Sequence, residues 1–262
     1  MVIDLSKQTA LVCGSTQGIG RAVAEMMAAA GARVVLLARN EEKLKEVVAQ
    51  LPCRHNQIHS YLQADFNKPE QLKNKLAEFI KQVGSISILV NNTGGPKAGP
   101  ASTASVEEFE IAFSNHLVCN QVLMQECLEG MKNQKMGRII NIISTSVKQP
   151  LKGLGVSNTI RAAVANWAKT LSVELAPFGI TVNNVLPGAT STQRLNEIIK
   201  NKAEKSANSR ETIELEMLNE IPAGRFASPQ EIAHAVVFLA SAQAAYINGI
   251  NLPVDGGRTA CL

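Results

Sequence analysis

The sequence predicts an α/β protein in which a parallel sheet carries helices on both of its faces. Short apolar runs, each about the length of a strand, alternate along the chain with longer segments that have helical periodicity. Strands that are separated by helices favour a parallel sheet with crossover connections. A glycine-rich turn directly follows the first apolar run, at the position where such sheets bind phosphate groups.

The first strand, turn and helix form the best-defined unit. The apolar run 10–13 is too short for a helix and is bounded by a turn, so we expect a buried strand. Glycine allows a tight exit from the strand and close approach of a pyrophosphate to the backbone, and the N-terminus of the following helix favours an anion. We therefore expect a dinucleotide to bind at Gly14, Ser15, Thr16, Gln17, Gly18, Ile19 and Gly20.

Six further apolar runs complete the predicted sheet. They are short and bounded by turns or charged segments, as expected of strands that are buried on both faces. The predicted strands span 33–38, 58–63, 86–90, 138–143, 180–185 and 250–254. The sequence therefore predicts a Rossmann-type, doubly wound parallel sheet of about seven strands.

Helical patterns fill the segments between these strands. Pro69 falls in the first turn of its helix, where its missing N–H is not needed. The charged run 41–46 is expected to face solvent. The predicted helices begin near Gly18 and span 41–50, 69–83, 106–131, 155–176 and 229–239.

No linker or repeat divides the chain, so we expect one dinucleotide-binding domain over residues 1–262. The regular spacing of strands fails only in a polar insertion at about 191–222, which has an amphipathic pattern at Ile198, Ile199, Ile213 and Met217. An insertion after a strand's C-terminal end commonly covers the substrate in such sheets. A merely solvated pair of helices fits the pattern equally well.

Composition excludes several other classes of protein. The net charge of +4 comes without a basic run interleaved with aromatic residues, which argues against nucleic-acid binding. No apolar run is long enough to cross a membrane, and the N-terminus lacks the pattern of a secretory signal. The 5 cysteines lack the paired spacing of a metal site, so we expect no metal, reduced thiols and a cytoplasmic location, with Cys13 a buried packing residue.

The end of the second strand bears on the choice of cofactor. An acid here commonly binds the ribose 2′-hydroxyl of NAD, but this chain has Arg39, 19 residues after Gly20. A guanidinium suits the 2′-phosphate of NADP, which an acid would repel. The sequence therefore favours NADP(H) over NAD(H), although a plain surface arginine is the alternative.

Together these features resemble the short-chain dehydrogenase/reductase family over nearly the whole chain. The segment 13–20 matches the family's Thr-Gly-x-x-x-Gly-x-Gly, with Cys13 in place of the usual threonine, and 224–233 and 254–257 are similar to its C-terminal signatures. The resemblance implies further cofactor contacts at Asp65, Phe66, Asn92, Thr93, Gly94, Pro187, Gly188 and Thr192.

The family's catalytic motif is altered in this chain. In the family a tyrosine protonates the carbonyl that receives the hydride, a lysine four residues later lowers the tyrosine pKa and holds the nicotinamide ribose, and a serine steadies the substrate oxygen. Ser144 matches that serine, while Ser157 and Arg161 occupy the tyrosine and lysine positions. The only tyrosines, Tyr61 and Tyr246, lie far from this helix in the predicted pattern.

The family's relay asparagine falls on His116 when the chain is counted without gaps, and on Asn115 after a shift of one residue. Serine is a poor proton donor and arginine stays charged, whereas histidine titrates near neutrality. His116 is therefore the best remaining acid, and a histidine satisfied by its neighbours is the alternative.

The resemblance implies an NADP(H)-dependent oxidoreductase that acts like 3-oxoacyl-carrier-protein reductases on a small-molecule carbonyl or alcohol, with acyl thioesters among the candidate substrates. Ser144 would polarise the oxygen, Arg161 would hold the cofactor ribose, and His116 or water would supply the proton. The alternative is a non-catalytic dinucleotide-binding sensor or partner subunit. The family forms dimers or tetramers through the two long helices and the C-terminal strand, so we expect a homodimer or homotetramer, with which Trp167 is consistent.

Overall fold

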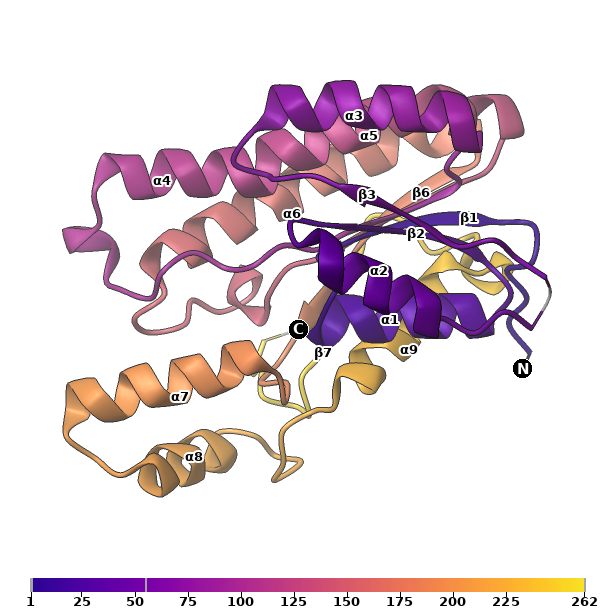
Figure 1. Ribbon diagram of the computed structural model, residues 1–262. Helices are drawn as coiled ribbons and strands as arrows, with labels where there is room; N and C mark the ends of the chain where they lie inside the picture. Colours follow the sequence, from indigo (N-terminus) through magenta and orange to yellow (C-terminus); the bar gives the residue numbers. More distant parts are fainter. Residues whose placement is uncertain (1, 55, 262) are drawn as a thin grey trace.

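The structure is a computed structural model that describes residues 2–54 and 56–261. Its centre is a seven-stranded, fully parallel sheet with the order β3-β2-β1-β4-β5-β6-β7 (Figure 1). The strands are β1 (Thr9–Cys13), β2 (Arg33–Ala38), β3 (Ser60–Gln63), β4 (Ile88–Asn91), β5 (Gly137–Ile142), β6 (Ile180–Pro187) and β7 (Asn251–Val254). The predicted doubly wound parallel fold is confirmed.

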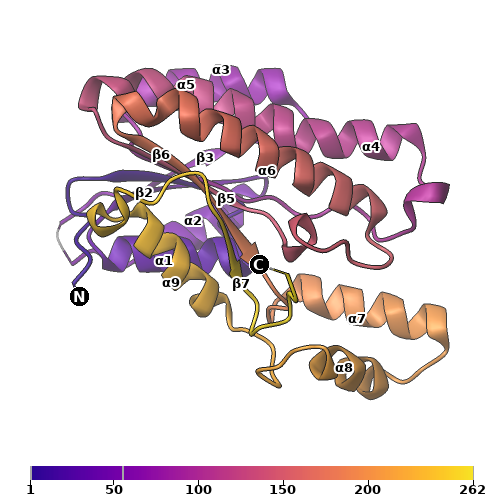
Figure 2. The ribbon, with the colours of Figure 1, turned by 180° about the vertical axis from the view of Figure 1, so that it is seen from behind.

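Helices cover both faces of the sheet, and the two views of the ribbon agree on their arrangement (Figures 1 and 2). One face carries α1 (Gly18–Ala29), α2 (Glu41–Gln50) and α9 (Pro229–Ala240). The other carries α3 (Pro69–Val83), α4 (Val106–Phe113), α5 (Cys119–Gln134) and α6 (Gly155–Leu175). Within the described residues, no helix combines the length and apolarity that a membrane span requires.

The strands divide their side chains between two cores because successive residues of a strand point to opposite faces. In β1, Ala10 and Val12 pack into the core beneath α1 and α9, whereas Leu11 and Cys13 pack into the core beneath α3, α5 and α6. This double burial explains why the strands have continuous apolar sequences rather than alternating ones.

The direction of winding reverses at β1. This strand pairs with β2 on one side and with β4 on the other, so the connections from β1 and β4 leave toward opposite faces. A crevice therefore opens at the carboxyl ends of these strands, where doubly wound sheets bind their ligands.

One predicted helix differs from the structure. The segment expected as a single helix over 106–131 is broken by a π-helical turn at Ser114–Val118, between α4 and α5. A π turn adds a residue to the helical repeat and so rotates the side chains that follow it. This changes which neighbours of His116 face the crevice.

The insertion at about 191–222 forms two helices, α7 (Gln193–Ser206) and α8 (Arg210–Asn219), which extend away from the sheet (Figure 1). They share a small core of Leu195, Ile199, Ile213 and Met217. The amphipathic pattern thus reflects packing of the two helices against each other.

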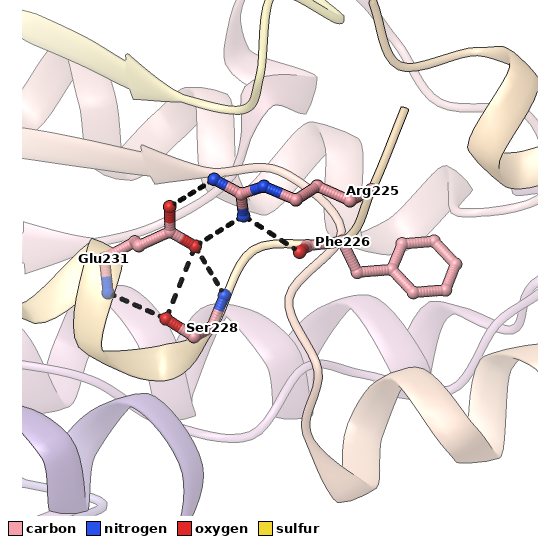
Figure 3. A network of polar contacts seen from close by, with 4 residues as sticks. All are labelled: Arg225, Phe226, Ser228 and Glu231. Atoms are coloured by element: carbon pink, nitrogen blue, oxygen red, sulfur yellow. Dashed lines mark hydrogen bonds and ion pairs between the residues drawn. The ribbon is translucent and has the colours of Figure 1, made fainter. Parts of the chain in front are cut away.

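A polar network fixes the base of this extension (Figure 3). Arg225 donates to both carboxylate oxygens of Glu231 at 2.8 and 2.6 Å, and Ser228 and Glu231 form a capping box at the start of α9. Between these residues, Ala227 accepts a backbone hydrogen bond from Ser191 at 2.8 Å. The network therefore ties the start of α7 to the body of the molecule.

Candidate active site

A cavity of about 730 Å³ lies at the carboxyl edge of the sheet. Its walls come from the turn after β1, the ends of β2, β4 and β5, one face of α6, and the segment that runs from β6 into α7. Most of the residues expected at the site line this one cavity: Gly14, Thr16, Gln17, Gly18, Ile19, Arg39, Asp65, Phe66, Asn92, Thr93, Gly94, Ser144, Ser157, Arg161, Pro187, Gly188 and Thr192.

Two residues of the glycine turn lie behind the wall instead. Ser15 is fully buried, and its hydroxyl donates to the Leu37 carbonyl at 3.4 Å. A Cβ on Gly20 would overlap the carbonyl oxygen of Gly14, so this glycine permits the helix to pack against the turn. These contacts indicate that Ser15 and Gly20 help to shape the turn.

Two glycines, Gly14 and Gly18, leave part of the turn without side chains. Gly14 has φ +58°, and a Cβ there would lie 2.7 Å from the amide nitrogen of Asn92. That amide donates to the carbonyls of Cys13 and Gly14 at 3.2 and 3.3 Å, which ties the turn to the end of β4. Across the turn, a Cβ on Gly18 would lie 3.3 Å from the methyl group of Thr192. The turn can thus expose its N–H groups to a pyrophosphate.

Two basic side chains line the cavity at the end of β2. Arg39 is exposed there, as expected, and Lys43 in the first turn of α2 joins it. Asn40 caps this helix by accepting from the Lys43 backbone N–H at 2.9 Å. The charged run 41–46 predicts a solvated Lys43, although its spacing of four from Arg39 could have indicated the pair.

A chain of amides lines the wall beyond β3. The Asn67 amide donates to Asp65 at 3.0 Å, and the Asn115 amide donates to Asn67 at 3.0 Å. Asn115 lies in the π turn and faces the cavity. Between the two alternatives for the relay position, the structure favours Asn115.

His116 is buried behind this wall, with 3% of its surface exposed. Burial and the nearby charge of Arg161 lower the pKa of His116 to about 2, despite a hydrogen bond to the Gly94 backbone. The imidazole is therefore uncharged at neutral pH and does not line the cavity. A general acid is a protonated group in contact with the substrate, so this placement disfavours His116 as the source of the proton.

The cavity brings together the three other expected catalytic positions. Ser144 follows β5, and its oxygen accepts from the Ser146 N–H at 3.1 Å, which leaves the hydroxyl hydrogen available to a ligand. Ser157 and Arg161 are four residues apart on α6, so they share one face of the helix. All three line the cavity.

Arg161 is held in place by backbone carbonyls. One guanidinium nitrogen donates to Ile142 at 3.1 Å and another to Thr93 at 3.5 Å, at the ends of β5 and β4. Burial, together with the charge of Arg194, lowers the pKa of Arg161 to about 10. The side chain still carries its charge at neutral pH.

No tyrosine is found among the described residues that line the cavity. The Tyr61 hydroxyl donates to Glu41 at 3.1 Å, and Tyr246 is fully exposed on the surface.

Over the described part of the chain, no group of three or more His, Cys, Asp or Glu side chains could hold a metal ion. Cys13 is buried, which raises the pKa of its thiol and agrees with a packing role.

Arg194 is the main residue of the cavity that sequence reasoning missed. It lies in the first turn of α7 and donates to the Pro96 carbonyl at 2.8 Å. The helix dipole disfavours a cation at this position. That local conflict, two residues after Thr192, is the signal that could have identified it.

The chain is similar to known reductases over nearly its full length. Residues 14–259 match a family described as enoyl-(acyl carrier protein) reductase. The NADPH-dependent reductase BacG of Bacillus subtilis is 30% identical over 97% of this chain and 98% of its own. The 3-oxoacyl-[acyl-carrier-protein] reductase FabG of Aquifex aeolicus is 33% identical over 98% and 99%, respectively. The solved structure of L-sorbose reductase from Gluconobacter frateurii, complexed with NADPH and L-sorbose, has a TM-score of 0.93 and 30% identity and covers 100% of both chains.

Proposed function

Because the chain belongs to the short-chain dehydrogenase/reductase family, we propose that it is an NADP(H)-dependent oxidoreductase that reduces the carbonyl group of a small molecule. The observation that carries this proposal is the single cavity that joins the glycine turn to Ser144 and Arg161. A dinucleotide site and a polar site for a carbonyl oxygen are thereby adjacent. The NADPH-dependent relatives support the choice of cofactor.

The residues of the cavity fit a phosphorylated dinucleotide. The side-chain-free turn at Gly14 and Gly18 would hold the pyrophosphate, and Arg39 with Lys43 would hold the 2′-phosphate. Asp65 and Phe66 would lie at the adenine ring. At the other end, Asn92, Thr93, Gly94, Pro187, Gly188 and Thr192 would surround the nicotinamide portion.

When bound, the reduced cofactor supplies the hydride. Ser144 would donate a hydrogen bond to the carbonyl oxygen, and the fixed charge of Arg161 would stabilise the negative charge that develops there. By the resemblance to the family, Arg161 would also hold the nicotinamide ribose. Since His116 is uncharged and lies outside the cavity wall, we assign the proton to water, which can enter the open side of the site. The helices α7 and α8 would cover the substrate.

A second candidate is a dinucleotide-binding protein without turnover. It is favoured by the lack of a tyrosine among the described cavity residues, because serine and arginine are poor proton donors at neutral pH. This candidate keeps the cofactor site and loses the chemistry.

The test is to measure NADPH oxidation and NADPH affinity with a panel of small ketones, oxo acids and acetoacetyl thioesters. We expect turnover, and a fall of about 100-fold or more in Ser144→Ala. Ser206→Ala, at an exposed position near the end of α7, is the matched control and should not change the rate. Tight binding without turnover would favour the second candidate, and absence of binding would contradict both.

We further propose a cytoplasmic homodimer or homotetramer. Its 5 cysteines are all free, in keeping with a reducing compartment. Exposed apolar side chains on α4 and α6, among them Ile111, Phe113 and Val173, support association through this face.

A further inference from the structure

Two guanidinium groups converge on the loop after β4. A Cβ built on Gly95 would lie 3.6 Å from Nη2 of Arg194 and 3.9 Å from Nη2 of Arg161. The two arginines come from different helices, α7 and α6, and both line the cavity. Because Gly95 has no side chain, the space between them and the loop stays open.

No carboxylate of the described structure bridges the two guanidinium groups. Arg161 is buried, with 8% of its surface exposed. It makes no ion pair with a described residue, and its Nε has no hydrogen-bond partner among the described residues. Arg194 has an ion pair only with Glu197, at 3.7 Å, on its own half-exposed helix face. Among the described residues that line the cavity, the single acid is Asp65, which accepts from Asn67. A buried cation beside a second cation is costly unless an anion joins them.

Both side chains are held in position before any ligand arrives. Arg161 donates to the carbonyls of Ile142 and Thr93, and Arg194 donates to Pro96 at 2.8 Å. Arg194 also lies in the first turn of α7, against the preference of the helix dipole. A bound anion would offset this unfavourable placement as well as the repulsion between the guanidinium groups.

The two arginines flank a different loop from the turn that suits the cofactor pyrophosphate. The turn that suits the pyrophosphate contacts Thr192 and Asn92, whereas the arginines flank Gly95. Ser144 and Ser157 line the same cavity. An anionic group at the arginines and a carbonyl at Ser144 can therefore belong to one small molecule.

We infer that the substrate is an anionic carbonyl compound, a small oxo acid, whose carboxylate binds between Arg194 and Arg161 while its ketone lies at Ser144. This inference rests on the proposed reductase function. A carboxylate is the anion that matches a guanidinium fork in plane and spacing.

The kinetic test compares acids with their neutral esters. Acetoacetate and 2-oxobutanoate are assayed beside methyl acetoacetate and methyl 2-oxobutanoate in the wild type, in Arg194→Gln and in Arg194→Lys. We expect Arg194→Gln to lower the ratio of kcat/KM for acid over ester at least about tenfold, and Arg194→Lys to restore part of it. Arg210→Gln is the matched control, because Arg210 is an exposed arginine of α8 paired with Glu214 at 2.7 Å. An unchanged ratio in Arg194→Gln overturns the inference.

A binding test keeps the inference falsifiable if no ketone is turned over. Calorimetric titration of butanoate, butanamide and inorganic phosphate, with and without NADPH, needs no reaction. Binding of butanoate over butanamide that weakens at least about tenfold in Arg194→Gln supports the inference, even where the proposed reductase activity fails. Preference for phosphate over butanoate, or a loss of NADPH affinity as large as the loss of butanoate affinity, overturns it.

Discussion

At the scale of single residues, we expect two basic side chains near the end of β2 to decide the choice of cofactor. Arg39 and Lys43 line the same end of the cavity, and both are exposed enough to reach a phosphate. Replacing Arg39 by Asp in a Lys43→Ala background should weaken NADPH about 100-fold and NADH much less, because only NADPH carries the 2′-phosphate. Fluorescence titration with both nucleotides measures this difference.

Arg54→Asp is the control for that change, since Arg54 is exposed and lies outside the cavity wall. Arg54→Asp changes the net charge by the same amount as Arg39→Asp alone, and it should leave the preference for NADPH intact. An equal loss of both nucleotides in the Arg39 variant would mean that these side chains do not recognise the 2′-phosphate.

His116 makes the stability of the protein depend on pH. The pKa of His116 is about 2 in the folded state, well below its usual value of 6.5, chiefly because of burial. The unfolded chain therefore takes up a proton that the folded protein does not, and stability falls as the pH drops below about 6.5. Between pH 7.5 and pH 5 this residue should cost about 2 kcal/mol of unfolding free energy.

Urea unfolding at the two pH values tests this prediction. His116→Asn should show a smaller loss of stability on acidification than the wild type. His234→Gln, at an exposed position of α9, should keep the pH dependence of the wild type. The same dependence in His116→Asn and in the wild type would contradict the assigned burial.

At the scale of elements, the turn between β1 and α1 requires glycine for packing as well as for ligand access. A Cβ on Gly20 would overlap the carbonyl oxygen of Gly14. Gly20→Ala should therefore cost about 1–3 kcal/mol of unfolding free energy and weaken NADPH at least about tenfold, because the helix must move away from the turn. Thermal unfolding and nucleotide titration measure the two effects.

Gly99→Ala provides the comparison, because a Cβ at that position would meet no atom within 4 Å. We expect it to leave both stability and nucleotide affinity near the wild-type values. If Gly20→Ala also behaved like the wild type, the tight helix–turn contact would not be needed.

At the scale of the whole molecule, α4 and α6 lie in one helical layer (Figure 2), and both carry exposed apolar side chains. Ile111 and Phe113 on α4 are 48% and 45% exposed, respectively. Light scattering should give the mass of a homodimer or homotetramer, and the double variant Ile111→Asp, Phe113→Glu should shift the mass toward that of the monomer. Ile58→Glu, which removes an exposed apolar residue ahead of β3, should not change the mass.

The sequence by itself determined the features that are local in the chain. Strand periodicity, the glycine turn and the helix spacing of Ser157 and Arg161 depend on residues within one or two turns of each other, so they predict the sheet, the phosphate cradle and one wall of the site. For the same reason Arg39 was found from its distance to Gly20.

Only the tertiary structure decided which residues face one another. A π turn places Asn115 in the wall and His116 behind it, and burial next to Arg161 then removes the charge of the imidazole. Arg194 comes near Arg161 because the start of α7 lies against the loop after β4, which no spacing along the chain could indicate. Charge and burial depend on neighbours through space, so the chemistry of this site is determined by the fold rather than by any one segment.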